Sequence, residues 1–156
     1  METIESLLAD VPFFARLAPD HLALVAGCAT NVHFDEDEVL FREGEQADVF
    51  YLVRHGAVAV EMFAPPRGTT AIETIEAGEI IGWSWLFPPY RWHFDARALV
   101  PVRATAFDGA CIRGKCADDP ALGYALMSQF AQVLIERLQW TRLRLLDVYG
   151  NGRGAG

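Results

Sequence analysis

The chain has almost no lysine and is acidic overall. Lys115 is its one lysine, and 13 basic residues stand against 21 acidic ones, for a formal net charge of −8. A surface that binds nucleic acid without sequence preference needs clustered basic side chains. The composition therefore argues against DNA binding by this chain, although a local cationic group could still bind a small anion.

Long apolar runs and a basic N-terminus are also missing. No apolar run reaches the roughly 18 residues that a membrane-spanning helix requires. Residues 1–10 carry acidic side chains and no basic cluster, so they do not resemble a signal peptide. We therefore expect a cytoplasmic protein without a membrane partner.

Cysteine is scarce and the recognised catalytic motifs are absent. The odd number of cysteines, Cys28, Cys111 and Cys116, suggests reduced thiols rather than a disulfide framework. An iron–sulfur cluster would need about four suitably spaced cysteines, so we expect no metal cofactor. Ser-His-Asp, His-Glu-x-x-His and P-loop patterns are not found, which indicates that the chain is not an enzyme.

The pattern of apolar residues divides the chain into three parts. Residues 1–28 have the composition of short helices, with Pro19 at the start of the second. Between 29 and 108 the apolar period is two, and Gly, Pro and Asp turns recur roughly every eight to twelve residues, which is typical of an antiparallel sandwich or barrel. The strands we expect there begin near residue 29 and cover 39–41, 49–53, 57–63, 69–75, 96–100 and 102–107.

The third part, residues 110–149, is predicted to be helical. Pro120 is suited to the first turn of a long helix. That helix has two apolar stripes, more than one docking face requires. The first contains Leu126, Phe130, Val133, Leu134, Leu138 and Leu145, and the second Met127, Ala131, Ile135, Arg142 and Leu146. One stripe would cover the barrel and the other a second copy of the chain or a partner protein. Residues 150–156 are expected to be a flexible tail.

The segment 78–98 has an unusual composition. It contains three of the four tryptophans, an adjacent proline pair and two arginines, Arg91 and Arg97. Neither a buried strand nor an ordinary surface loop needs this combination. A short helix beginning near Gly82, followed by a cationic return, would account for it.

Two glycine-punctuated motifs resemble those of the cyclic nucleotide-binding domain family. In the segment 41–58 a Gly44-Glu45 turn precedes an apolar strand and a second turn at Gly56. The segment 78–82, Gly-Glu-Ile-Ile-Gly, is similar to the start of the family's phosphate-binding cassette. The resemblance extends over residues 8–149. It implies a mainly β, α+β fold: an antiparallel eight-stranded β-roll or jelly roll with N-terminal helices and a long C-terminal helix, in one domain covering residues 1–149.

The resemblance also implies a ligand site in the segment 78–98, which we call the cassette. In the family, N–H groups of the cassette helix meet a cyclic phosphate, a Glu takes the ribose hydroxyl and an Arg pairs with the phosphate. Here Trp83 stands at the Glu position and Trp92 at the Arg position, with Arg91 one residue before it. The candidate ligand-binding residues are Gly82, Trp83, Ser84, Trp85, Leu86, Arg91 and Trp92.

Two functions remain open at this stage. The first is a regulatory or sensory module that binds cyclic AMP, cyclic GMP or a related anionic ligand at the cassette and signals through the C-terminal helix. The second is a degenerate domain whose pocket is filled by tryptophan and which serves protein–protein interaction or homodimerisation. Several relatives continue past the long helix into a DNA-binding helix-turn-helix. This chain ends at Gly156, so we expect a stand-alone module that does not bind DNA by itself.

Overall fold

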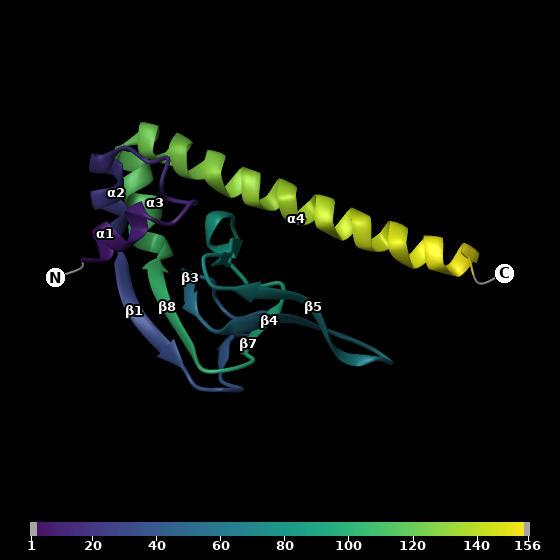
Figure 1. Cartoon of the computed structure of the whole chain (residues 1–156). Coiled ribbons are helices and arrows are strands. Elements are labelled where there is room, and N and C mark those ends of the chain that lie inside the picture. Colours follow the sequence, from purple (N-terminus) through teal and green to yellow (C-terminus); the bar gives the residue numbers. More distant parts are fainter. Residues whose placement is uncertain (1–2, 155–156) are drawn as a thin grey trace.

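Two antiparallel sheets form a β-roll in residues 3–154, the part of the chain that this computed structural model describes, with side chains to residue 147 (Figure 1). Their strands are β1 (Ala29–Phe34), β2 (Val39–Phe41), β3 (Val49–His55), β4 (Ala57–Ala64), β5 (Gly68–Glu76), β6 (Ile80–Ile81), β7 (Asp95–Ala98) and β8 (Val102–Asp108). One sheet has the order β1-β8-β3-β6 and the other β2-β7-β4-β5. The predicted fold class is confirmed.

Strand β3 contributes to two separate cores. Phe50 and Leu52 pack on the helical side of their sheet, whereas Tyr51 and Val53 pack in the interior of the roll. Successive side chains of a strand point to opposite faces, so a strand covered on both faces is apolar throughout. This explains the continuous apolar run from Val49 to Val53.

The helices gather at one end of the β-roll, beside β1 (Figure 1). They are α1 (Ile4–Ala9), α2 (Pro19–Ala26) and α3 (Gly109–Asp118), followed by the long α4 (Pro120–Gly154). The first half of α4 packs against them through the buried Leu122, Leu126 and Phe130, spaced four residues apart. Its second half runs past the sheets and is largely exposed.

Helix α4 begins where the sequence predicted. Asp119 lies between α3 and α4 and accepts a hydrogen bond from the backbone N–H of Leu122, and Pro120 occupies the first turn. The helix also includes residues 150–154, which the sequence predicted to be a flexible tail. Residues 155–156 lie outside the described part of the chain.

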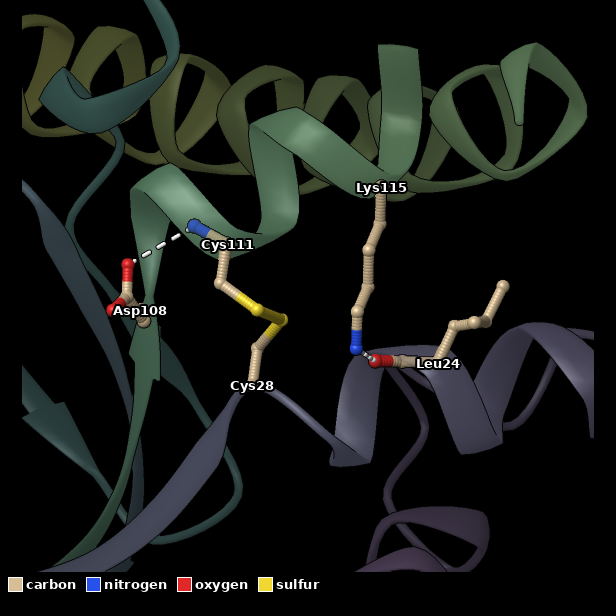
Figure 2. The surroundings of a disulfide bond; sticks show 5 residues. All are labelled: Leu24, Cys28, Asp108, Cys111 and Lys115. Carbon is tan, nitrogen blue, oxygen red and sulfur yellow. Dashed lines mark hydrogen bonds between the residues drawn. A yellow bond between two sulfur atoms is a disulfide. The ribbon is translucent and has the colours of Figure 1, made fainter. Parts of the chain in front are cut away.

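A disulfide contradicts the expectation of reduced thiols. Cys28, just before β1, is bonded to Cys111 in the first turn of α3, at a sequence separation of 83 (Figure 2). Close by, the ammonium group of Lys115 donates to the carbonyl oxygen of Leu24 at 2.7 Å. Both links join α3 to the segment that contains α2. Cys116 remains a free thiol. Within residues 3–154, no helix combines the length and apolar character that crossing a membrane demands.

Candidate functional site

Within the cassette the chain turns sharply at Gly82, and we call this the cassette turn. This glycine follows β6 and has φ +102°, a conformation that L-residues with a Cβ atom rarely adopt. The helix expected next is a single 3-10 turn, η1 (Ser84–Leu86). Ser84 does not cap it, because the N-cap position is occupied by Trp83, which makes no side-chain capping hydrogen bond.

The space beside Gly82 is filled by Trp92. A Cβ atom built on Gly82 would lie 2.9 Å from Cη2 of the Trp92 ring. That ring is buried and stacks on Phe41, with ring centroids 3.7 Å apart and planes inclined by 10°. The position where the family resemblance implies a phosphate-binding arginine therefore holds an indole that is part of the core.

Trp85 belongs to the helical core and not to a ligand pocket. Its indole N–H donates to the carbonyl oxygen of Gly82 at 3.2 Å, and its ring stacks on Phe50. Arg113 of α3 donates to the Trp85 carbonyl at 2.6 Å. Leu86 packs, half-buried, against the same core. Trp85 and Leu86 thus fasten the cassette to α3 and the helical core.

Arg91 contacts the segment around Gly44. Its guanidinium donates to the carbonyl oxygen of Gly44 at 3.3 Å, and its backbone forms an isolated bridge with Gln46. The side chain is exposed. The one-residue offset between Arg91 and Trp92 therefore decides which side chain enters the core, and the arginine remains outside.

Arg97 forms ion pairs with Glu61 of β4 and with Asp37. It donates to Glu61 at 2.8 Å and to Asp37 at 2.6 Å. The hydrogen bond with Glu61, the pair's Coulomb attraction and the second carboxylate raise the pKa of Arg97 above its ordinary value. Arg97 is thus paired with two carboxylates outside the cassette turn.

A cavity of about 610 Å³ nevertheless lies between the cassette and the second half of α4. Its walls are mostly apolar and come from three places. The cassette side and β2 supply Phe41, Ile81, Gly82, Trp83, Ser84, Trp92, His93 and Phe94; β4 and β5 supply Val60, Met62, Ala71, Ile72 and Glu73; α4 supplies Leu134, Arg137, Leu138, Thr141, Arg144 and Leu145. Four of the seven candidate residues, Gly82, Trp83, Ser84 and Trp92, line this cavity.

Two arginines of α4 reach the cavity, and neither was among the candidates predicted from the sequence. Arg137 lies 3.3 Å from a carboxylate oxygen of Glu73, donates to the carbonyl of Ile80 and stacks over the Trp83 ring at 4.7 Å. Burial lowers the pKa of Arg137, and nearby carboxylates, Glu73 first among them, oppose that shift. Arg144 donates to the carbonyl oxygen of Ile72 at 2.7 Å.

The helical spacing of the sequence could have placed these two arginines on the cavity side of α4. The cavity-facing residues of α4 fall at positions 134, 137, 138, 141, 144 and 145, which is the spacing of one helix face. Leu134, Leu138 and Leu145 belong to the first of the two apolar stripes that the sequence predicted for this helix. Arginines interleaved with that stripe must point the same way.

Among the residues that the structure describes, no group of three or more His, Cys, Asp or Glu side chains could hold a metal ion. The cavity wall offers aromatic rings, aliphatic surface, the polar side chains of Ser84, Thr141 and His93, and the charges of Arg137, Arg144 and Glu73.

Comparisons with known proteins agree on one family. The sequence model of the cyclic nucleotide-binding domain matches residues 31–119. The chain is 26% identical over 145 residues to a CRP-like cAMP-activated global transcriptional regulator of Mycobacterium tuberculosis. That alignment covers 93% of this chain and 63% of the relative, so the chain spans less than two thirds of the relative's length.

Solved structures show the same fold. A protein from Geobacter metallireducens GS-15 named for cyclic nucleotide binding superposes with a TM-score of 0.78 at 30% identity, covering 88% of this chain and 99% of its own. A cyclic nucleotide-binding domain from Methylobacillus flagellatus KT gives the same TM-score at 21% identity, covering 92% of this chain and 80% of its own. The second likeness concerns the fold alone.

Proposed function

The chain belongs to the cyclic nucleotide-binding domain family, and on that premise we propose that it is a non-enzymatic regulatory domain that binds a small anionic, nucleotide-like ligand in the cassette cavity. The observation that carries this proposal is the make-up of the cavity wall. Gly82, Trp83 and Ser84 form one side and α4 forms the other. The volume of about 610 Å³ lies within the roughly 300–1,000 Å³ typical of small-molecule sites.

Binding would be signalled through α4, because the same helix closes the cavity. Arg137 ties α4 to the carbonyl of Ile80, to Glu73 and to the Trp83 ring. A ligand shifts a conformational equilibrium only by its differential affinity for the two states. A ligand that contacts both Trp83 and α4 meets this condition, since it interacts differently with each position of the helix.

Cyclic AMP and cyclic GMP are the first ligands to test. The Mycobacterium tuberculosis relative is described as cAMP-activated, which supports the choice. The cassette itself does not offer the family's usual carboxylate and guanidinium, since Trp83 and Trp92 take their places. A bound nucleotide would therefore depend on aromatic stacking and on charges elsewhere in the cavity.

A thermal-shift and calorimetric titration tests the proposal. We expect one of cyclic AMP, cyclic GMP or a cyclic dinucleotide to bind in a 1:1 ratio. At about 100 times its dissociation constant it would stabilise the fold by roughly 2.7 kcal/mol, or about 5–10 °C in Tm. If none of these nucleotides gives a response at millimolar concentration, the proposal of a nucleotide ligand is wrong.

A pair of variants on β5 locates the binding. Ala71 lines the cavity, while its neighbour Thr70 does not, and both are exposed. Ala71→Trp should fill the cavity and abolish binding, whereas Thr70→Trp adds the same indole outside it and should leave binding unchanged. Equal affinities in the two variants would place the ligand elsewhere.

The exposed apolar surface of α4 supports a further part of the proposal, association through this helix. Ile135, Leu143 and Leu146 are more than half exposed and do not line the cavity. Apolar groups in such a row favour burial against a second helix. We propose a homodimer, or a partner protein, on this face. Light scattering that shows only monomer at high concentration for wild type and Leu143→Glu alike would contradict homodimerisation.

Two other expectations stay predictions. The absence of DNA binding by this chain and a cytoplasmic location both rest on the sequence. The Cys28–Cys111 disulfide argues against the cytoplasmic location, because reducing compartments seldom maintain disulfides.

A further inference from the structure

Resting on the proposed function, we infer that the ligand's anionic group is held by α4, at Arg144, and not by the cassette. The site would accordingly accept an apolar, planar anion: an aromatic body that carries a carboxylate, sulfonate or phosphate group at one end.

The cassette arginines are unavailable for this role. Arg91 does not line the cavity, and its guanidinium donates to the carbonyl of Gly44. Arg97 is paired with Glu61 and Asp37. Arg144 is also exposed, but unlike these two arginines it lines the cavity.

The two cavity arginines differ in what already neutralises them. Arg137 has Glu73 at 3.3 Å, so this pair has no net charge, and its guanidinium is fixed over Trp83. Arg144 donates to one backbone carbonyl, that of Ile72. Among the residues whose side chains the structure describes, no carboxylate lies within 4.0 Å of Arg144. The positive charge left over in the cavity is therefore that of Arg144.

The rest of the wall suits an aromatic body. Trp92 and Phe41 present a stacked, mostly buried pair of rings, and Trp83 lies half-buried at the same wall. Leu138 of α4 and Ile72 of β5 add aliphatic surface. Aromatic rings stack favourably on such surfaces, and a ligand that lay there would place its charged end toward α4.

In this arrangement the ligand would contact α4 directly, through Arg144. Arg144 follows Arg137 by two helical turns along α4, and it already bridges to β5 through Ile72. An anion on Arg144 whose aromatic end rests on Trp92 links the second half of α4 to the barrel. The charge of the ligand, and not only its volume, would then set the position of the helix.

A matched pair of dyes tests the assignment. The probes are 1-anilinonaphthalene-8-sulfonate and N-phenyl-1-naphthylamine, which has the same rings without the sulfonate. Fluorescence titration should show wild type binding the sulfonate in a 1:1 ratio. Arg144→Gln should bind the sulfonate about tenfold more weakly but the neutral dye equally well, and Arg144→Lys should recover part of the loss.

Controls separate this inference from the proposed function. Arg142→Gln removes the same charge from α4 at a position that does not line the cavity, and it should leave both titrations unchanged. Circular dichroism checks that each variant is folded. Wild-type affinity for the sulfonate in Arg144→Gln, or no sulfonate binding by wild type, would overturn the inference. If Ala71→Trp binds both dyes and cyclic nucleotides as wild type does, the cavity is not the site and the proposed function falls with it.

Discussion

The contact between Gly82 and Trp92 can be measured by adding one methyl group. In Gly82→Ala the new Cβ atom would lie 2.9 Å from Cη2 and 3.1 Å from Cζ3 of the Trp92 ring. Trp92 has little freedom to withdraw, because it is only 4% exposed and is stacked on Phe41. The substitution therefore meets a steric obstacle in addition to an unfavourable backbone conformation.

The two contributions can be estimated separately. A residue with a Cβ atom at φ +102° costs about 1–2 kcal/mol. Forcing extra volume into a packed core costs about 1–3 kcal/mol more. We expect Gly82→Ala to lower the free energy of unfolding by about 2–5 kcal/mol. Gly44 has φ +87° and nothing within 4 Å of its Cβ position, so Gly44→Ala should cost only about 1–2 kcal/mol.

Urea unfolding followed by circular dichroism gives both values. The difference between Gly82→Ala and Gly44→Ala isolates the Trp92 contact. In a Trp92→Phe background, whose smaller ring lacks the two nearest atoms, Gly82→Ala should cost no more than Gly44→Ala. Equal costs for the two glycine variants in the wild-type background would refute the placement of Trp92 beside the cassette turn.

Three further predictions concern other parts of the structure. Cys111→Ser should lower the free energy of unfolding by about 4–5 kcal/mol, from the chain-entropy estimate for a separation of 83 residues. The control Cys116→Ser alters the free thiol and should change the free energy of unfolding little. Equal effects of the two variants in urea unfolding would argue against the disulfide. Arg137→Met should cost about 1–3 kcal/mol, because Glu73 loses its partner, and a Tm no lower than that of wild type would contradict this. Burial raises the pKa of Tyr51 above 10.0, so the folded state favours the protonated phenol and stability should fall as the pH rises through 10.0. Tyr51→Phe should lose less stability than wild type between pH 9 and 11 in urea unfolding, and identical pH profiles would refute the assignment.

The architecture could be predicted because local signals agree with one another. The alternation of apolar residues from position 57 to 63 corresponds to β4, and the turn residues between the runs fall between strands. Strand β6 has only two residues, Ile80 and Ile81, too few for a periodic pattern. The sequence therefore did not predict β6 as a separate strand, and its two residues fell within the predicted start of the cassette.

The candidate site was less accessible to sequence reasoning, because its contacts are non-local. Cys28 and Cys111 are 83 residues apart, and no spacing rule predicts their pairing. Arg137 donates a hydrogen bond to the carbonyl of Ile80, at a sequence separation of 57. The sequence did show that Trp83 and Trp92 replace the family's polar residues. It did not show that Trp92 packs on Phe41 or that a cavity remains beyond it.

Hydrogen exchange read by mass spectrometry tests the central claim most directly, measured with and without a saturating concentration of each of the three cyclic nucleotide ligands used in the titration. The claim is that a ligand in the cavity contacts the cassette and α4 together. The account predicts slower exchange in two separate segments, residues 81–86 and residues 137–145, and no comparable change in β1. Binding that slows exchange at only one of these walls, or no change anywhere at saturating nucleotide, would contradict it.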